Sequence, residues 1–234
     1  MSIIPSFPRV TLGRDVTYID KALAAQSAKL KPFRYDGPVG TKGKWTIREF
    51  TIPKESLGVL RLVRDGGRGC APGKYHQLLR TEPNGSKTIV MSDTDAEMID
   101  FLSVIRPGWD GQILIGGLGM GLAIKTLLMM PEVGFITVVE LDPELIELTK
   151  SMYAKEQRVE IIQGDIFKWK VPKGAKYDWA WFDIWDTISD DNIPDFQRLK
   201  RKYRKYLPST DRLTFWAERE CVLMKRDVDP RHWY

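Results

Sequence analysis

One stretch of the chain, residues 112–142, contains an apolar run, a glycine cluster, a helical run, a second apolar run and a carboxylate. The run Ile113–Ile115 is short and continuous, which is typical of a strand buried on both faces of a parallel sheet. Leu122–Met130 is predicted to form a helix that Pro131 ends, and Phe135–Val139 to form the next buried strand. The stretch therefore predicts one strand–helix–strand unit.

The glycine cluster at 116–121 lets the backbone turn tightly and lets a ligand approach the start of the following helix. Glu140 lies 19 residues beyond Gly121, at the carboxyl end of the second strand, where a carboxylate can accept hydrogen bonds from a ribose diol. Dinucleotide sites use G-x-G-x-x-G or G-x-G-x-x-A, whereas Leu122 stands at the sixth position here. The spacing favours a nucleoside ligand without a pyrophosphate, and plain tight packing of the glycines is the alternative interpretation.

Length and composition limit the remaining choices. The 234 residues, 43% of them hydrophobic, can bury a full core, and one domain with an N-terminal elaboration is expected. No apolar run approaches the roughly 18 residues needed to span a bilayer, and the start of the chain lacks a charged leader with a long apolar stretch. A cytoplasmic protein with no membrane contact is expected. Two cysteines (Cys70, Cys221) and two histidines (His76, His232) cannot assemble a zinc framework, so no metal site is predicted.

Pattern changes divide the chain into three regions. Residues 1–44 are rich in proline and glycine, with one helix expected from Val16 to Leu30, and are interpreted as an N-terminal arm. Residues 45–92 contain alternating runs bounded by Gly, Pro and Asn turns, which predicts a small antiparallel sheet. The runs in that region are WTIREFTI, LGVLRLVR, YHQLLRT and KTIVMS.

Residues 93–234 are interpreted as a Rossmann-like nucleoside-binding domain that ends in basic helices. Thr94 and Glu97 have the spacing of a capping box that opens a helix, and Asp142 with Pro143 has the pattern of a second helix start. The expected elements are strands 112–115, 135–140, 158–163 and 177–182, and helices 120–130, 143–155 and 194–207. Strands separated by helices predict a mostly parallel sheet covered on both faces. Only 27 residues follow 207, too few for the two or three further strands with crossovers of a full doubly wound domain.

Polar residues follow the carboxyl ends of four predicted strands, where ligand sites form in open parallel sheets. They are the glycine loop, Glu140, Asp165 after Gly164, and Asp183 with Asp186. Glu140 could instead cap the next helix, and Asp165 could be an ordinary turn residue. Asp183 ends an aromatic-rich buried strand, so its carboxylate loses part of its water and needs a partner or a function.

The series GGLGMG, VVELDPELIEL, RVEIIQGDIF and KYDWAWFDIWD resembles class I S-adenosylmethionine-dependent transferases. Within them it is most similar to the spermidine synthase branch, over about residues 45–186. The resemblance implies an α/β fold with a Rossmann-like, mostly parallel sheet after a small antiparallel β region, and S-adenosyl-L-methionine as cofactor. It assigns Gly117, Gly119 and Gly121 to the nucleoside loop, Glu140 to the ribose, Asp165 to the adenine amine and Asp183 to the reacting edge. Their neighbours Leu118, Leu141 and Ile166 would also contact the cofactor.

Departures from that branch concern the group that is transferred. The family's loop carboxylate, which contacts the aminopropyl amine, falls on Met120 here. Asp186 matches the family's second acid, but Thr187 replaces the proline after it. The upstream helix offers only Glu97 and Asp100 in place of the family's His-Glu pair. These differences disfavour aminopropyl transfer.

The favoured function is therefore an S-adenosylmethionine-dependent methyltransferase whose acceptor the sequence does not name. The whole chain is similar to small methyltransferase-like proteins of bacterial and phage genomes. Asp183 is the candidate base, since an amine or hydroxyl nucleophile must lose a proton, and Asp186 is a second carboxylate near it. Aminopropyl transfer and a non-catalytic binding or assembly protein on the same fold are the alternatives.

The helix expected at 194–207 carries most of the local positive charge. Its cations are Arg198, Lys200, Arg201, Lys202, Arg204 and Lys205. The net charge of +5 permits an acidic partner without requiring one. A solvated amphipathic helix is favoured over a nucleic-acid surface. The sequence leaves a homo-oligomer open.

Overall fold

The structure is a computed structural model that describes residues 24–53, 70–105 and 109–227. The chain divides into two compact units: Met1–Pro107 with Gly119–Thr126, and Gly108–Leu118 with Leu127–Tyr234. Each unit is described by itself. The helix expected at 16–30 is present over residues 24–30, and the rest of it lies outside the described residues. The predicted strand LGVLRLVR also lies outside them.

The first unit contains a four-stranded antiparallel sheet with strand order β1-β2-β3-β4. Its strands are β1 (Gly40–Lys42), β2 (Trp45–Ile52), β3 (Gly73–Thr81) and β4 (Lys87–Ser92). The predicted strands WTIREFTI and KTIVMS match β2 and β4, and YHQLLRT lies within β3. Gly85 has a φ of +82° in the turn between β3 and β4, a conformation that favours glycine. The prediction of a small antiparallel sheet is confirmed.

Helix α3 (Asp95–Val104) follows β4 and begins at the predicted position, but the predicted capping box is wrong. The side chain of Thr94 makes no capping hydrogen bond to the helix. Glu97 instead accepts hydrogen bonds from the backbone N–H and the hydroxyl group of Ser92, the last residue of β4. The carboxylate therefore ties the strand to the helix, because Ser92 offers it two donors.

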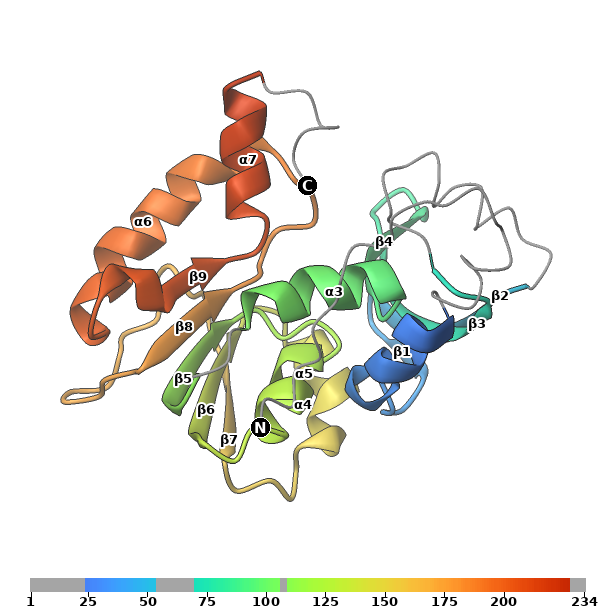
Figure 1. The fold of residues 1–234 in the computed structure, drawn as a ribbon, viewed down its shortest axis with the longest axis horizontal. Coiled ribbons are helices and arrows are strands. Elements are labelled where there is room, and N and C mark those ends of the chain that lie inside the picture. Colours follow the sequence, from blue (N-terminus) through green and yellow to red (C-terminus); the bar gives the residue numbers. More distant parts are fainter. Residues whose placement is uncertain (1–23, 54–69, 106–108, 228–234) are drawn as a thin grey trace. The chain divides into compact units, whose positions relative to one another are not determined.

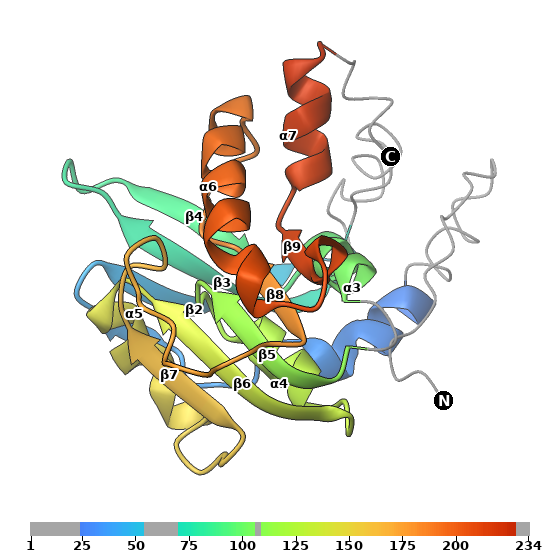
Figure 2. The ribbon, with the colours of Figure 1, turned by 90° about the vertical axis from the view of Figure 1, so that its left-hand side faces the viewer.

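The second unit contains a five-stranded sheet in which every neighbouring pair is parallel (Figures 1 and 2). Its strands are β5 (Gly111–Gly116), β6 (Val133–Glu140), β7 (Val159–Gln163), β8 (Trp179–Phe182) and β9 (Leu213–Phe215). They are arranged in the order β7-β6-β5-β8-β9. Numbered along the chain, this is 3-2-1-4-5, the order that begins a doubly wound nucleotide-binding sheet. The predicted α/β fold class is confirmed.

Three helices lie in connections between these strands, and a fourth, α7, follows β9. They are α4 (Leu122–Leu128), α5 (Pro143–Thr149), α6 (Ile193–Tyr203) and α7 (Glu218–Lys225). The 3-10 turns η2 (Lys150–Met152) and η4 (Arg204–Tyr206) continue α5 and α6, so the predicted helices 143–155 and 194–207 each end in a tighter turn. Asp142 caps α5 as predicted, because its carboxylate accepts a hydrogen bond from the N–H of Glu144 at 3.0 Å.

Strand β9 was not predicted. It pairs in parallel with β8, with Leu213 opposite Ala180 and Phe215 opposite Phe182. Three residues are too few to show a periodic pattern, and only the neighbouring strand gives them their extended form. The sheet therefore extends further toward its C-terminal side than the short end of the chain suggested.

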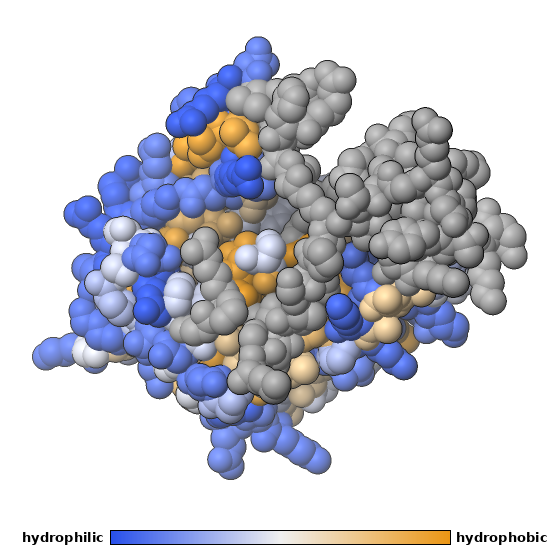
Figure 3. All heavy atoms as spheres, in the orientation of Figure 1, coloured by the Kyte–Doolittle hydropathy of each residue, from blue (hydrophilic) through white to orange (hydrophobic). Residues whose placement is uncertain are grey.

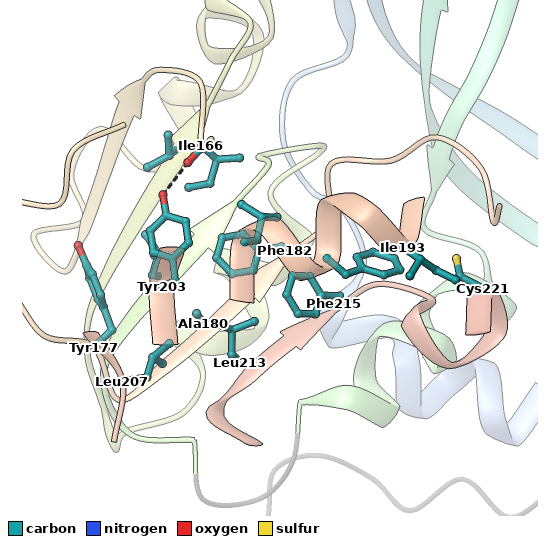
Figure 4. Close-up of a cluster of buried hydrophobic side chains, with 14 residues drawn as sticks. Ile166, Tyr177, Ala180, Phe182, Ile193, Tyr203, Leu207, Leu213, Phe215 and Cys221 are labelled. Atoms are coloured by element: carbon teal, nitrogen blue, oxygen red, sulfur yellow. Dashed lines mark hydrogen bonds between the residues drawn. The ribbon is translucent and has the colours of Figure 1, made fainter. Parts of the chain in front are cut away.

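The core of the second unit lies on both faces of its sheet. On one face, Phe182 packs among a cluster of residues from α6, β9 and α7 (Figure 4). Its ring centroid lies 5.2 Å from that of Tyr203 and 5.4 Å from that of Phe215. On the other face, Ile113 and Trp181 are also buried. Side chains of a strand alternate between faces, so the sheet is covered on both sides, as predicted.

We expect Phe182→Ala to lower the free energy of unfolding by about 3–5 kcal/mol, because it leaves a cavity in a fully buried aromatic cluster. Met224→Ala, at a position 37% exposed on α7, is the control and should change the free energy by less than about 0.5 kcal/mol. Urea denaturation followed by tryptophan fluorescence measures both. Equal effects would show that the cluster in Figure 4 does not stabilise the sheet.

Candidate nucleoside-binding site

The register of the parallel sheet brings four strand ends to one edge. Gly116 at the end of β5 lies opposite Phe182 at the end of β8, and Glu140 at the end of β6 lies opposite Gln163 at the end of β7. The backbone N–H of Asp183 donates to the carbonyl of Gly116 at 2.9 Å, which continues the pairing one residue past β8. In this topology the strand order reverses between β5 and β8, where open α/β sheets bind their ligands.

Gly117 fits between the ends of β5 and β8 only because it has no side chain. Its φ is +95°, and a Cβ atom there would lie 2.1 Å from the backbone carbonyl oxygen of Asp183. The tight-packing interpretation of the glycines therefore holds at Gly117. The same contact brings the start of the glycine loop against Asp183.

Glu140 holds the next residue of the loop. Its side chain is 8% exposed and accepts two backbone hydrogen bonds, each at 2.8 Å: Oε2 from the N–H of Leu118 and Oε1 from the N–H of Asp142. Asp142 is the N-cap of α5, so the alternative in which Glu140 caps that helix is wrong. The carboxylate connects the glycine loop to the residue that caps α5.

Burial raises the pKa of Glu140 above its ordinary value. The backbone N–H groups of Asp142 and Leu118 act in the opposite direction, and the carboxylate of Asp142 adds to the rise. The two carboxylate oxygens together have four lone-pair positions; they accept the hydrogen bonds of Leu118 and Asp142, and the N–H of Leu141 also lowers the pKa of this carboxyl group. The carboxylate can therefore still accept a hydrogen bond from a ribose hydroxyl group.

Asp165 forms the turn after β7. One carboxylate oxygen accepts a hydrogen bond from the N–H of Phe167 at 2.8 Å, and the other pairs with the ammonium of Lys168 at 3.1 Å. Partial burial acts to raise the pKa of Asp165, but Lys168 and the N–H of Phe167 outweigh it, so that pKa lies below its ordinary value. The turn role is present, and the carboxylate that makes it carries a full charge at neutral pH.

Two residues of α6 hold the same turn, and sequence reasoning missed both. The ammonium of Lys202 donates to the carbonyls of Ile166 and Trp169, at 3.0 and 2.6 Å. The hydroxyl of Tyr203 donates to the Ile166 carbonyl at 2.7 Å (Figure 4). Spacing along the chain gives no signal for a contact across 36 residues, although a lysine next to an inward-facing tyrosine could have prompted the question.

The remaining predicted residues differ in exposure. Asp183 is half-buried, Asp186 is exposed, and Leu141 is 68% exposed beside the buried Glu140. Direct contacts join Leu118 to Glu140 and Gly117 to Asp183. Asp165 follows Gly164, whose N–H donates to the Glu140 carbonyl, whereas Asp186 lies three residues beyond the edge.

The second half of the glycine loop belongs to the first unit and contacts β4 there. Gly119 and Gly121 both have positive φ angles, +52° and +78°. The N–H of Met120 donates to the sulfur of Met91 at 3.2 Å, and a Cβ atom on Gly119 would lie 2.5 Å from the same sulfur. Met120 is fully buried. At the position of the spermidine synthase carboxylate, this chain therefore has a buried apolar side chain.

Two other features are absent from the described residues. Within 24–53, 70–105 and 109–227, no three His, Cys, Asp or Glu side chains lie close enough together to hold a metal ion. In the same part of the chain, no helix is long and apolar enough to cross a membrane.

Comparison with known proteins gives a local likeness. No protein-family model matches the chain. A probable ribosomal RNA small subunit methyltransferase A from Methanococcoides burtonii is 34% identical over 59 residues, which is 25% of this chain and 22% of that protein. The chain therefore matches about a fifth of the length of this curated relative.

Solved structures give a similar picture. A putative methyltransferase from Thermoplasma acidophilum has a TM-score of 0.37 and 21% identity, covering 51% of this chain and 50% of its own. An S-adenosylmethionine-dependent methyltransferase from Clostridium acetobutylicum has a TM-score of 0.35 and 17% identity, covering 45% and 42%. TM-scores this low do not support an assignment of the fold. The fold is assigned from the strand order of the sheet.

We expect Lys202→Met and Tyr203→Phe to show coupled effects on stability. Each single change leaves the Ile166 carbonyl with one of its two side-chain donors and should cost about 1–2 kcal/mol. The double variant removes both donors from the carbonyl of the buried Ile166. Its loss of unfolding free energy should therefore exceed the sum of the two single losses by at least about 0.5 kcal/mol. Lys205→Met, at an exposed position, is the control. Urea denaturation of all four variants tests this, and simple additivity would contradict a shared acceptor.

The raised pKa of Glu140 predicts a specific pH dependence. The folded protein retains the Glu140 proton to a higher pH than the unfolded chain does, so this group lowers stability as pH rises from the ordinary glutamate pKa to the folded one. Glu140→Gln removes that dependence. The difference in unfolding free energy between wild type and variant should therefore fall across this window and stay constant above it. A difference that rises with pH would contradict the assignment.

Proposed function

We propose that the chain is an S-adenosylmethionine-dependent methyltransferase. The observation that carries the proposal is Glu140: a buried carboxylate at the end of β6 that binds the glycine loop through Leu118 and can still accept a hydrogen bond from a ligand. This is where a doubly wound sheet holds the ribose of its nucleoside. Asp165 follows β7, which neighbours β6, and Asp183 follows β8, which is separated from β6 by β5; they supply carboxylates on either side of Glu140.

The groups at this edge fit an adenosyl ligand. A carboxylate accepts hydrogen bonds only, and ribose hydroxyls and the adenine amine donate them, so Glu140 and Asp165 suit these two parts of the ligand. The exposed side chain of Leu141, next to Glu140, offers an apolar surface. No group at the edge resembles a pyrophosphate site, because Leu122 stands where dinucleotide loops have glycine or alanine.

When bound, S-adenosylmethionine would supply a methyl group already activated by its sulfonium. In the transfer, the acceptor's lone pair forms a bond to the methyl carbon while the carbon–sulfur bond breaks, and its electron pair stays on sulfur. An amine or hydroxyl acceptor also releases a proton, which Asp183 would take up. Half-burial of Asp183 limits its contact with water and suits this role. Asp186, which is exposed, would meet the acceptor rather than the reacting atom.

Two further observations favour methyl over aminopropyl transfer. Met120 is fully buried at the loop position where a spermidine synthase presents its carboxylate, so this chain offers no anion there for the aminopropyl amine. The local match is to a probable ribosomal RNA methyltransferase. The second observation supports methyl transfer and adds nothing about the acceptor beyond that relative's own name.

Calorimetric titration of the purified chain with S-adenosylmethionine, S-adenosylhomocysteine and decarboxylated S-adenosylmethionine tests the proposal. The first two should bind. Glu140→Gln should weaken their binding about 10- to 100-fold, because an amide cannot accept both hydroxyls while facing two backbone N–H groups. Glu160→Gln, at an exposed position of β7, is the matched control. If none of the three ligands binds, the proposal is wrong; tighter binding of the decarboxylated form would favour aminopropyl transfer.

Asp183→Asn separates binding from chemistry. This variant should retain cofactor affinity within about threefold, yet lower the transfer of labelled methyl to total cellular RNA and protein about 10²- to 10⁴-fold, the range of a general base. Cofactor binding with no transfer by the wild type to any acceptor would instead favour the non-catalytic alternative.

A further inference from the structure

Two short segments of the second unit carry a dense group of cations. Residues 166–177 contain four lysines and residues 196–210 contain six lysines and arginines, and neither segment has an Asp or Glu. The whole chain has 36 Lys and Arg against 31 Asp and Glu. Residues 1–107 have 17 basic and 11 acidic residues, whereas residues 108–234 without the two segments have 9 basic and 20 acidic ones. The ten cations therefore stand within an otherwise acidic part of the chain.

The two segments lie side by side, although about 20 residues separate them in sequence. In the middle of α6, the Arg198 guanidinium lies 4.7 Å from the ring centroid of Phe167. In the turn η4 that follows the helix, the carbonyl of Lys205 accepts a hydrogen bond from the ammonium of Lys176 at 2.8 Å, and the carbonyl of Tyr206 accepts one from the N–H of Tyr177. The loop before β8 therefore runs along α6, and its lysines join those of the helix in one surface.

Most cations of this basic surface are available to a ligand. Lys202 holds the turn after β7, Lys200 pairs with Glu218, and Lys168 pairs with Asp165. The other cations are exposed, namely Lys170, Lys173, Lys176, Arg198, Arg201, Arg204 and Lys205. Hydrophilic residues cover the surface over α6 in the space-filling view (Figure 3).

Aromatic rings stand among these cations. Phe167, Trp169 and Tyr206 each pack against the core and stay partly exposed. The ammonium groups of Lys176 and Lys205 lie 6.0 and 5.0 Å from the Tyr206 ring centroid. Cations bind phosphates, and partly exposed rings between them can stack on unpaired bases. An acidic peptide would use the charges alone, and a membrane would need exposed large apolar side chains, of which these segments have none among the described residues.

We propose that this basic surface binds single-stranded RNA. Duplex DNA is disfavoured by shape, because its major groove admits one helix, whereas here the loop lies along α6 and η4. RNA presents unpaired bases in loops and ends, where proteins stack aromatic rings on them. The surface starts at Ile166, directly after Asp165. The idea that RNA is also the methyl acceptor rests on the proposed function. The inference that RNA binds to this surface does not depend on it.

Fluorescence anisotropy of a labelled 20-nucleotide RNA of mixed sequence tests the inference. The RNA is titrated with the full chain at a series of KCl concentrations from about 50 to about 300 mM. The variant Arg201→Glu/Lys205→Glu reverses two exposed charges of the surface. The control Lys87→Glu/Lys155→Glu makes the same change of net charge at exposed positions elsewhere. Circular dichroism and the melting temperature establish that each variant is folded.

The surface variant should bind RNA at least about tenfold more weakly, and its slope of log affinity against log salt should fall by about 1.4, since each lost phosphate contact on a single strand contributes about 0.7. The control should change affinity by about twofold or less. Equal losses in both variants, tighter binding to duplex DNA, or equal competition by poly-glutamate or anionic vesicles would overturn the inference.

Calorimetry with S-adenosylhomocysteine on the same samples keeps the two proposals apart. If the cofactor product binds and RNA does not, the RNA inference is wrong and the proposed function stands. If RNA binds with the expected charge dependence and no adenosyl ligand binds, the proposed function is wrong and the RNA surface stands.

Discussion

The hydrogen bonds of the buried Glu140 carboxylate depend on the register of the whole parallel sheet. The carboxylate reaches Leu118 only because β5 and β6 end within one residue of each other. A shift of one residue along β6 would turn Glu140 to the opposite face and replace it with an apolar neighbour. The packing of the aromatic cluster around Phe182 fixes the positions of the strands. The same strand positions determine where the Glu140 carboxylate lies.

Local patterns predicted much of this fold, and contacts between distant segments account for what they missed. Alternation gave the bounds of β2, and Asp142 with Pro143 gave the start of α5, because both depend on neighbouring residues. The capping box failed because Ser92, from another element, competes for Glu97. The support of the turn after β7 by α6 is a contact of the same non-local kind, and no spacing rule describes it. The strand ends were predictable as a set, because parallel topology alone brings them to one edge.

Helix α6 shows how one short segment can serve three purposes. Its buried side, with Phe196 and Leu199, completes the core against the sheet. Lys202 and Tyr203 reach the turn that carries Asp165. Its outer side is basic. An amphipathic pattern distinguishes a buried side from a polar side, but it does not show which polar residues hold the turn and which face solvent. For this reason the sequence favoured a solvated face. The contacts of the adjacent loop distinguish a cation that supports the fold from one that faces solvent.

The placement of charge within the second unit also bears on how fast it would meet a partner. Ten cations lie in two adjoining segments, while the rest of residues 108–234 has 9 basic and 20 acidic residues. Such a distribution concentrates positive potential at one surface of this unit, which attracts an approaching polyanion before contact. The second unit would therefore meet a polyanion with this surface first. Added salt, by screening that field, would slow the arrival more than it alters the hydrogen bonds of the buried Glu140.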